Sequence, residues 1–149
     1  MKLEKIFFLG FPQLNVKMVF HNSYNILLNI IRVGYLCKHP YIDTVFNPKI
    51  MRLLKKLLQI RYVSHYETLD NNKIRVYLIY DANSLPNYRF TKLLFKPSHR
   101  TYISYKRLII LYKYDFGIVY IISTSVGLLT HREAISAQLG GELICVLYS

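Results

Sequence analysis

The residues whose types and spacing could perform catalysis are Ser123, His131 and Glu133. By type, they could supply the nucleophile, the base and the orienting acid of a hydrolase. The pattern does not favour this chemistry. The serine lacks the glycines of a nucleophile elbow, and His131 directly follows Thr130, a residue suited to capping a helix. We therefore expect that the chain is not an enzyme.

Metal chemistry is not favoured either. The eight acidic residues are scattered and offer no evident pair for the metal ion of a nuclease. The two cysteines, Cys37 and Cys145, lack the close spacing of zinc ligands, and Cys145 lies in an apolar run typical of a buried thiol. We expect no metal, no cofactor and no small-molecule substrate.

The charge balance points to a polyanionic partner. The 149 residues carry 20 Lys and Arg against 8 Asp and Glu, a formal net charge of +12, while 52% of the residues are hydrophobic. A compact basic body repels itself unless a polyanion neutralises it. Nucleic acid is the first candidate for that partner and an anionic membrane surface is the second.

The N-terminal stretch is interpreted as an extension, residues 1–21, rather than a targeting or membrane segment. Its apolar run, Ile6–Leu9, is shorter than the core of a secretory signal, and Pro12 follows it. Met18 is an alternative start. Elsewhere, no apolar run approaches the roughly 18 residues that cross a bilayer.

The first half predicts an α-β-α-β-β order. Leu27, Ile31 and Gly34 lie at helical spacing, and a short β-rich segment follows at 41–46. A second helix begins at Pro48, and a hairpin joins 61–67 to 73–80.

The helix that begins at Pro48 has two faces. Its apolar stripe comprises Ile50, Leu53, Leu54, Leu57 and Leu58. Its basic residues lie outside that stripe: Lys49, Arg52, Lys55 and Lys56. A solvated basic face on a core helix and a phosphate-facing helix explain this spacing equally well.

The second half is rich in strands. Glu133 lies three residues after Thr130, the spacing of a capping box at the start of a short helix. Residues 105–114 are basic and aromatic and remain undecided. The expected strands are 89–95, 100–104, 117–122 and 142–148. Overall we predict an α+β fold, with an N-terminal domain at 22–82 and a strand-rich C-terminal domain with a short helix at 88–149.

Two blocks of the second half decide the family. Residues 121–134 run Ile-Ile-Ser-Thr-Ser-Val-Gly-Leu-Leu-Thr-His-Arg-Glu-Ala, and Gly140-Gly141-Glu142 follows. Upstream, residues 96–106 begin Lys-Pro-Ser-His-Arg-Thr-Tyr. In this order and at this distance, the blocks closely resemble the bacterial-type ribosomal protein S8 family. The resemblance covers roughly Asn22 to Ser149. Three positions depart from the family pattern: Ser98 replaces a glycine, Val126 a commonly basic residue, and His131 an aspartate.

The resemblance implies a protein that clamps an irregular RNA stem. The hydroxyls of Ser123, Thr124 and Ser125 suit contacts with base edges and 2′-hydroxyls, Gly127 permits a tight turn, and Glu142 could accept from base amino groups. Further RNA contacts are expected from basic and aromatic residues: Arg32, Lys49, Arg52, Lys55, Lys56, Lys96, Arg100, Tyr102, Lys106 and Arg107.

The implied function is that of a structural constituent of the small ribosomal subunit. Its partners would be a central-domain stem of small-subunit rRNA and neighbouring ribosomal proteins. The scarcity of Ala and the abundance of Ile, Lys, Asn, Tyr and Phe are typical of an AT-rich genome, organellar ones included. Together with the departures from the bacterial pattern, this composition leads us to expect a mitochondrial ribosome, with a plastid as second choice. The alternatives are a basic peripheral membrane-surface protein and a free RNA-binding translational regulator.

Overall fold

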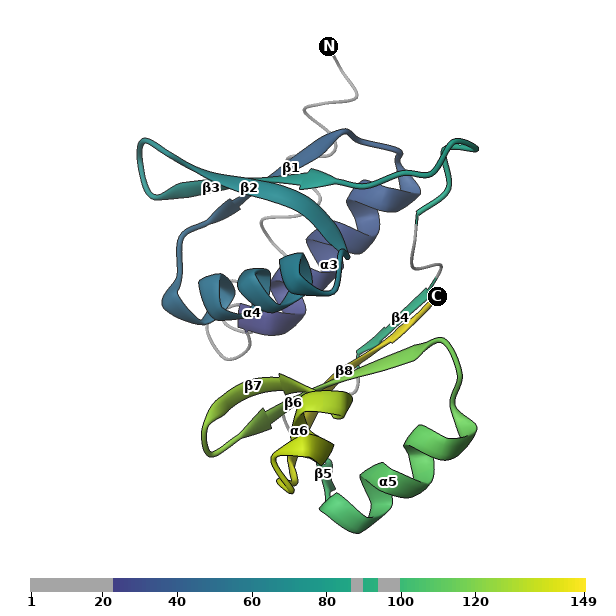
Figure 1. Ribbon diagram of the computed structural model, residues 1–149. Helices are drawn as coiled ribbons and strands as arrows, with labels where there is room; N and C mark the ends of the chain where they lie inside the picture. The colour runs from purple at the N-terminus through teal and green to yellow at the C-terminus, as the bar shows by residue number, and fades with distance from the viewer. Residues whose placement is uncertain (1–22, 87–89, 94–99) are drawn as a thin grey trace.

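The computed structural model describes residues 23–86, 90–93 and 100–149, arranged in two units. The first unit contains α3 (Ser23–Leu36), β1 (Tyr41–Val45), α4 (Pro48–Gln59), β2 (Val63–Leu69) and β3 (Lys73–Leu78). Its three antiparallel strands lie in the order β1-β3-β2, and both helices lie beneath the sheet in Figure 1, on the side of the second unit. The predicted α-β-α-β-β order is confirmed.

Helix α4 begins where its sequence predicts. The side chain of Asn47 accepts a hydrogen bond from the backbone N–H of Lys49 at 2.9 Å, and Pro48 occupies the first helical turn. Leu53 and Leu57 are fully buried, which confirms the apolar stripe as core. Its last expected member, Leu58, is 38% exposed and lies at the edge of that stripe.

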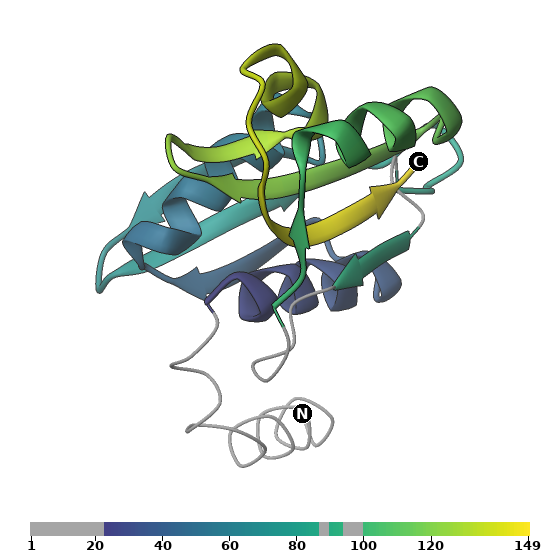
Figure 2. The same cartoon turned by 90° about the horizontal axis from the view of Figure 1, so that it is seen from below.

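The second unit contains β4 (Phe90–Leu93), β5 (Tyr102–Ile103), α5 (Tyr105–Tyr114), β6 (Ile118–Thr124), β7 (Gly127–Thr130), α6 (His131–Ser136) and β8 (Gly141–Tyr148). Its antiparallel strands lie in the order β4-β8-β6-β7, with β5 paired to β8. Figures 1 and 2 show α5 and α6 against one face of this sheet. The segment 105–114, undecided from sequence, is therefore a second helix of the unit, capped by Ser104.

The first unit packs against the other face of the second sheet. Ile121, Cys145 and Leu147 belong to the same buried cluster as Leu27 and Leu53. The opposite face of that sheet packs on α5 and α6 through a separate cluster: Ile103, Leu108, Ile122, Ala134 and Leu143. Because the two units share one close-packed core, the distance between their facing surfaces is fixed.

The predicted Ser-Thr-Ser loop is corrected by the structure. Ser123 and Thr124 are the last residues of β6, and only Ser125 and Val126 form the turn into β7. The reason is strand pairing, since Thr124 lies opposite Gly127 in the ladder. Gly127 has a φ of +128°, which L side chains rarely adopt, so the expectation of a turn glycine is confirmed.

Candidate nucleic-acid interface

A hollow of about 580 Å³ lies where α4 of the first unit faces the β6–β7 hairpin of the second. The hairpin contributes Ser123 to Leu128. The first unit contributes Tyr24 from α3 and the cations Arg52 and Lys55 from α4. The structure therefore brings the predicted hydroxyl residues and two of the predicted basic residues into one site, although they belong to different units.

A row of side chains crosses the second sheet beside this hollow. Glu142 of β8 lies opposite Tyr102 of β5 on one side and opposite Ser123 of β6 on the other. Ser123 in turn lies opposite Leu128 of β7. Directly opposed residues of antiparallel strands point to the same face, so the carboxylate of Glu142 stands beside the hydroxyl of Ser123, which lines the hollow.

Glu142 carries a carboxylate oxygen that has no hydrogen-bond donor among the described residues. Its side chain is 17% exposed, and its Oε1 is buried without a hydrogen-bond partner among the described residues. Arg100 approaches that oxygen through Nε at 3.8 Å, an ion pair rather than a hydrogen bond. A buried acceptor without a donor costs free energy that a ligand's N–H or O–H group would recover.

Gly141 allows the two strands to come this close. A Cβ atom at Gly141 would lie 2.2 Å from the carbonyl oxygen of Ser123, so any other residue would push β8 away from β6. The glycine of the Gly-Gly-Glu block therefore fixes the distance between Ser123 and Glu142.

Tyr24 is the residue of the hollow that the sequence prediction missed. It lies in the first turn of α3, is partly buried and packs against the core shared by the two units. Burial raises the pKa of its phenol, Arg52 opposes that rise and Glu142 adds to it. Its spacing to Leu27, Leu28 and Ile31 is that of an apolar stripe, so the pattern indicated a core position alone.

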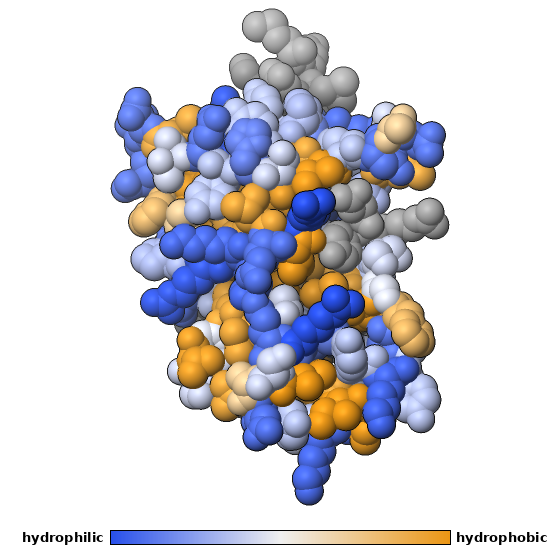
Figure 3. All heavy atoms as spheres, in the orientation of Figure 1, coloured by the Kyte–Doolittle hydropathy of each residue, from blue (hydrophilic) through white to orange (hydrophobic). Residues whose placement is uncertain are grey.

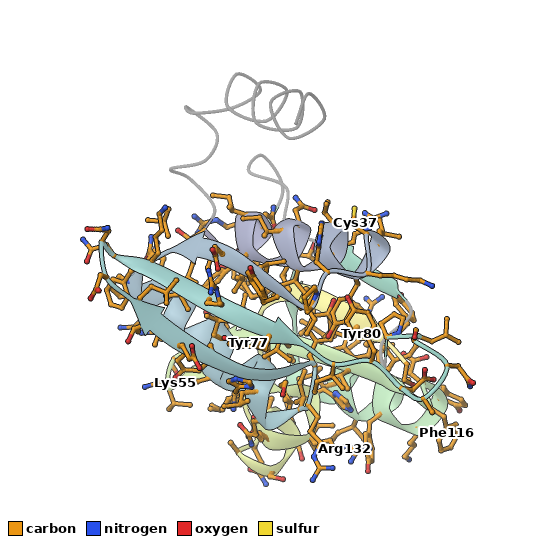
Figure 4. The ribbon with its side chains drawn as sticks, turned by 90° about the horizontal axis from the view of Figure 1, so that it is seen from above. Cys37, Lys55, Tyr77, Tyr80, Phe116 and Arg132 are labelled. Carbon is orange, nitrogen blue, oxygen red and sulfur yellow. The ribbon has the colours of Figure 1, made fainter. Side chains whose placement is uncertain are left out.

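The basic residues of α4 separate into three kinds. Arg52 and Lys55 are exposed and line the hollow, and Figure 4 shows Lys55 at the margin of the molecule. Lys49 is exposed and lies outside the lining. Lys56 pairs with Glu133 of α6 at 2.9 Å and also donates to Gln59. Figure 3 shows hydrophilic side chains gathered over α4 and the junction of the two units.

Comparison with known proteins matches the family model of ribosomal protein S8 to residues 25–148. The chain belongs to the ribosomal protein S8 family. The predicted family is confirmed, and the match leaves the predicted N-terminal extension outside it.

Curated relatives of this family cover most of the chain. Small ribosomal subunit protein uS8 of Chlamydia pneumoniae is 32% identical over 82% of this chain and 92% of its own. The uS8 protein of Dictyoglomus thermophilum is 34% identical over 79% of this chain and 90% of its own. Small ribosomal subunit protein uS8m of Acanthamoeba castellanii is 30% identical over 79% and 92%.

Several residues predicted from the S8 resemblance lie away from the hollow. Lys106 and Arg107 are exposed on the first turn of α5, and Arg32 is exposed on α3. Lys96 lies outside the described residues. Tyr102 is 67% exposed beside Glu142, so its ring is open to a stacking partner.

His131, which replaces an aspartate of the S8 pattern, is a structural residue here. It is only 4% exposed, and its Nδ1 accepts a hydrogen bond from the backbone N–H of Tyr120 at 3.2 Å. Burial lowers the pKa of its imidazole, with Arg132 adding to the effect, so the neutral form is favoured. This histidine joins the start of α6 to β6.

Glu133 completes the predicted capping box and also joins the two units. Its Oε2 accepts from the backbone N–H of Thr130 at 2.8 Å, while Lys56 and Gln59 donate to the same carboxylate from α4. Burial alone would raise the pKa of Glu133, but these hydrogen bonds together lower it to about 2.

No helix within the described ranges is long and apolar enough to cross a membrane.

Proposed function

We propose that this chain is a structural, non-catalytic constituent of the small ribosomal subunit. In this proposal it binds a stem of the central domain of small-subunit rRNA, contacts neighbouring ribosomal proteins and helps the subunit to assemble. Membership of the ribosomal protein S8 family supports the ribosomal role. The observation that carries RNA binding is the hollow in which hydroxyl side chains of the second unit meet basic side chains of the first, with Glu142 beside the lining residue Ser123.

The chemistry of the hollow suits folded RNA. An A-form helix has a wide, shallow minor groove that displays 2′-hydroxyls and base edges. Ser123 and Ser125 can donate to and accept from such groups, and Glu142 can accept only. Arg52 and Lys55 supply the positive charge that phosphates require, which gives affinity without sequence information.

The proposed location is a mitochondrial ribosome, with a plastid ribosome as second choice. The AT-type composition and the relative named uS8m support this location, while several bacterial relatives match at similar identity. The test is sedimentation of ribosomes from purified organelles. Recovery of the chain in the mitochondrial small-subunit fraction supports the proposal, and recovery in plastid or cytosolic ribosomes contradicts it.

The membrane-surface alternative, which is based on the net charge of +12 and the helix that begins at Pro48, is less well supported than RNA binding. A helix that lies on a membrane needs an exposed apolar face. The stripe of α4 faces the core instead, with Leu53, Leu54 and Leu57 fully buried. A free translational regulator would use the same RNA-binding surface. If the chain is such a regulator and not a ribosomal constituent, it should be absent from the small subunits that sediment.

The direct test of RNA binding is a filter-binding titration of the full chain. The probes are a transcript of the central-domain stem and a stem of the same composition in scrambled order, at a stated salt concentration. We expect affinity for the cognate stem at least tenfold higher, about 1.4 kcal/mol. Equal affinity for both stems would leave only the non-specific attraction of a basic protein.

A further inference from the structure

Packing occupies the ring of Tyr24 and leaves its hydroxyl available for a ligand. The ring packs against the shared core, which fixes its position, and the side chain also lines the hollow between α4 and the hairpin. Ser123 lines the same hollow and lies directly opposite Glu142 in the sheet, so Glu142 is the immediate neighbour of a residue that shares the hollow with Tyr24. Arg52 and Glu142 both influence the pKa of the phenol. A side chain held by packing loses little entropy when it binds.

The two oxygen-bearing groups have opposite hydrogen-bonding roles. Burial raises the pKa of Tyr24, so at neutral pH its phenol is protonated and can donate. The carboxylate of Glu142 can only accept, and its buried Oε1 has no hydrogen-bond partner among the described residues. Ser123 stands opposite Glu142 in the sheet and can take either role.

A donor and an acceptor so placed select a ligand group that both accepts and donates. A base amino group alone would satisfy Glu142 but could not accept from Tyr24, and a base edge could do both only through two neighbouring atoms. A phosphate oxygen would accept from Tyr24 but would meet the negative charge of Glu142. A ribose 2′-hydroxyl accepts one hydrogen bond and donates another, so it satisfies both side chains at once.

We propose that Tyr24 and Glu142 together hold one ribose 2′-hydroxyl of the bound RNA, with Tyr24 donating and Glu142 accepting. The inference rests on the proposed RNA-binding function and deepens it. It makes the first unit a direct participant in recognition, and it gives the hollow a means to distinguish RNA from DNA at one nucleotide.

The test combines a conservative substitution with modified RNA. Tyr24→Phe removes the hydroxyl and keeps the ring that packs on the core. Tyr66→Phe is the matched control, because Tyr66 is also partly buried against that core and does not line the hollow. Each full-length protein is titrated with the central-domain stem, and then with a set of stems that each carry one 2′-deoxy nucleotide at a successive position.

We expect Tyr24→Phe to weaken binding to the unmodified stem by about threefold to tenfold, the worth of one hydrogen bond. Tyr66→Phe should bind like the wild type. At one position, the 2′-deoxy stem should bind the wild type more weakly but should weaken binding of the Tyr24→Phe protein little further. Such coupling is the mark of two groups that act through one contact.

Two results would overturn the inference while leaving the proposed function intact. One is unchanged affinity of Tyr24→Phe for the cognate stem. The other is a reduction in affinity that stays equal on the unmodified stem and on every 2′-deoxy stem. The proposed function itself fails separately, if the wild type does not prefer the cognate stem to the scrambled one.

Discussion

The three hydroxyl residues near the hairpin differ in what their oxygens are free to do. The hydroxyl of Thr124 donates to the carbonyl oxygen of Gly127 at 2.9 Å and accepts from the backbone N–H of Val126 at 3.3 Å. Thr124 therefore holds the turn, while Ser123 near the end of β6 and Ser125 within the turn also line the hollow. A run that looked uniform in the sequence divides into one structural and two candidate binding residues.

We predict that Ser123→Ala combined with Ser125→Ala lowers the affinity for the central-domain stem. Removing each buried hydrogen bond should cost on the order of 1–3 kcal/mol, because a polar group on the RNA is left without a partner. The free energy of unfolding should change little. Filter binding and urea denaturation of the same protein measure the two quantities, and unchanged affinity would refute the prediction.

At the residue scale, sequence patterns located the groups that stand out chemically and missed the one that does not. Ser123, Ser125 and Glu142 were predicted because the blocks that contain them resemble the S8 family and their side chains suit contacts with RNA. Tyr24 was not, because its position in an apolar helical stripe predicts burial and says nothing about its hydroxyl. Its role depends on the distance between two units, which no local pattern contains.

Among the elements, α4 shows how one helix can serve two purposes. Its apolar face completes the core, and its basic face divides between the hollow and an ion pair. Periodicity predicted the two faces and Asn47 predicted the start. It could not tell which lysine has a protein partner, because Glu133 lies 77 residues away in the sequence.

The salt dependence of RNA binding should separate the residues of α4. Replacing Arg52 or Lys55 by Gln should flatten the slope of log K against log salt by somewhat under about one unit each, since each neutralises one phosphate. Lys56→Gln serves as the matched control and should leave the slope unchanged. If the slope stays constant for Arg52 and Lys55 as well, the basic face is only solvated.

The contact between α4 and α6 should make stability depend on acid pH through Glu133. Its folded pKa is about 2 and its ordinary value is 4.5, so its stabilising effect is complete above about pH 4.5 and is lost as the pH falls toward 2. The free energy of unfolding of the wild type should exceed that of Glu133→Gln at pH 6, with the gap closing on acidification. A gap that is constant over this range would contradict the assignment.

The elements that sequence predicted best are those with local signals. Asn47 with Pro48 marked α4, and Thr130 with Glu133 marked the capping box of α6. Helix α5 was left undecided because its aromatic and branched residues are common in strands and only its contact with the second sheet settles its form. Strand β7 was missed because it is short and follows a two-residue turn.

For the whole molecule, the shared core decides how the two units can act. Ile121, Cys145 and Leu147 of the second sheet are buried in the cluster of the first unit. Separating the units would expose this apolar surface to water, at a cost of about 25 cal/mol for each Å². The sequence predicted two units and could not show that they share one core.

We predict that the second unit nevertheless carries the specific part of recognition. A fragment of residues 88–149 should prefer the cognate stem to the scrambled stem and should gain its structure only when that RNA is present, through binding linkage. A fragment of residues 22–82 should bind both stems alike. Titration of each fragment with both stems, followed by circular dichroism, measures its stem preference and its gain of structure. If only the N-terminal fragment distinguishes the two stems, the prediction is wrong.

The central claim is that the hollow between the units faces the rRNA, and a tethered cleavage reagent tests it most directly. Ser125 lies at the tip of the hairpin, whereas Cys37 is exposed beyond the far end of α3, the helix whose first turn holds Tyr24. An iron chelate is attached to the thiol introduced at position 125 in a Ser125→Cys, Cys37→Ser protein, and to the native Cys37 in a second protein. In complexes with small-subunit rRNA, we expect strand scission concentrated in the central-domain stem from position 125, with little from position 37. Equal or stronger cleavage of that stem from position 37 would contradict the claim.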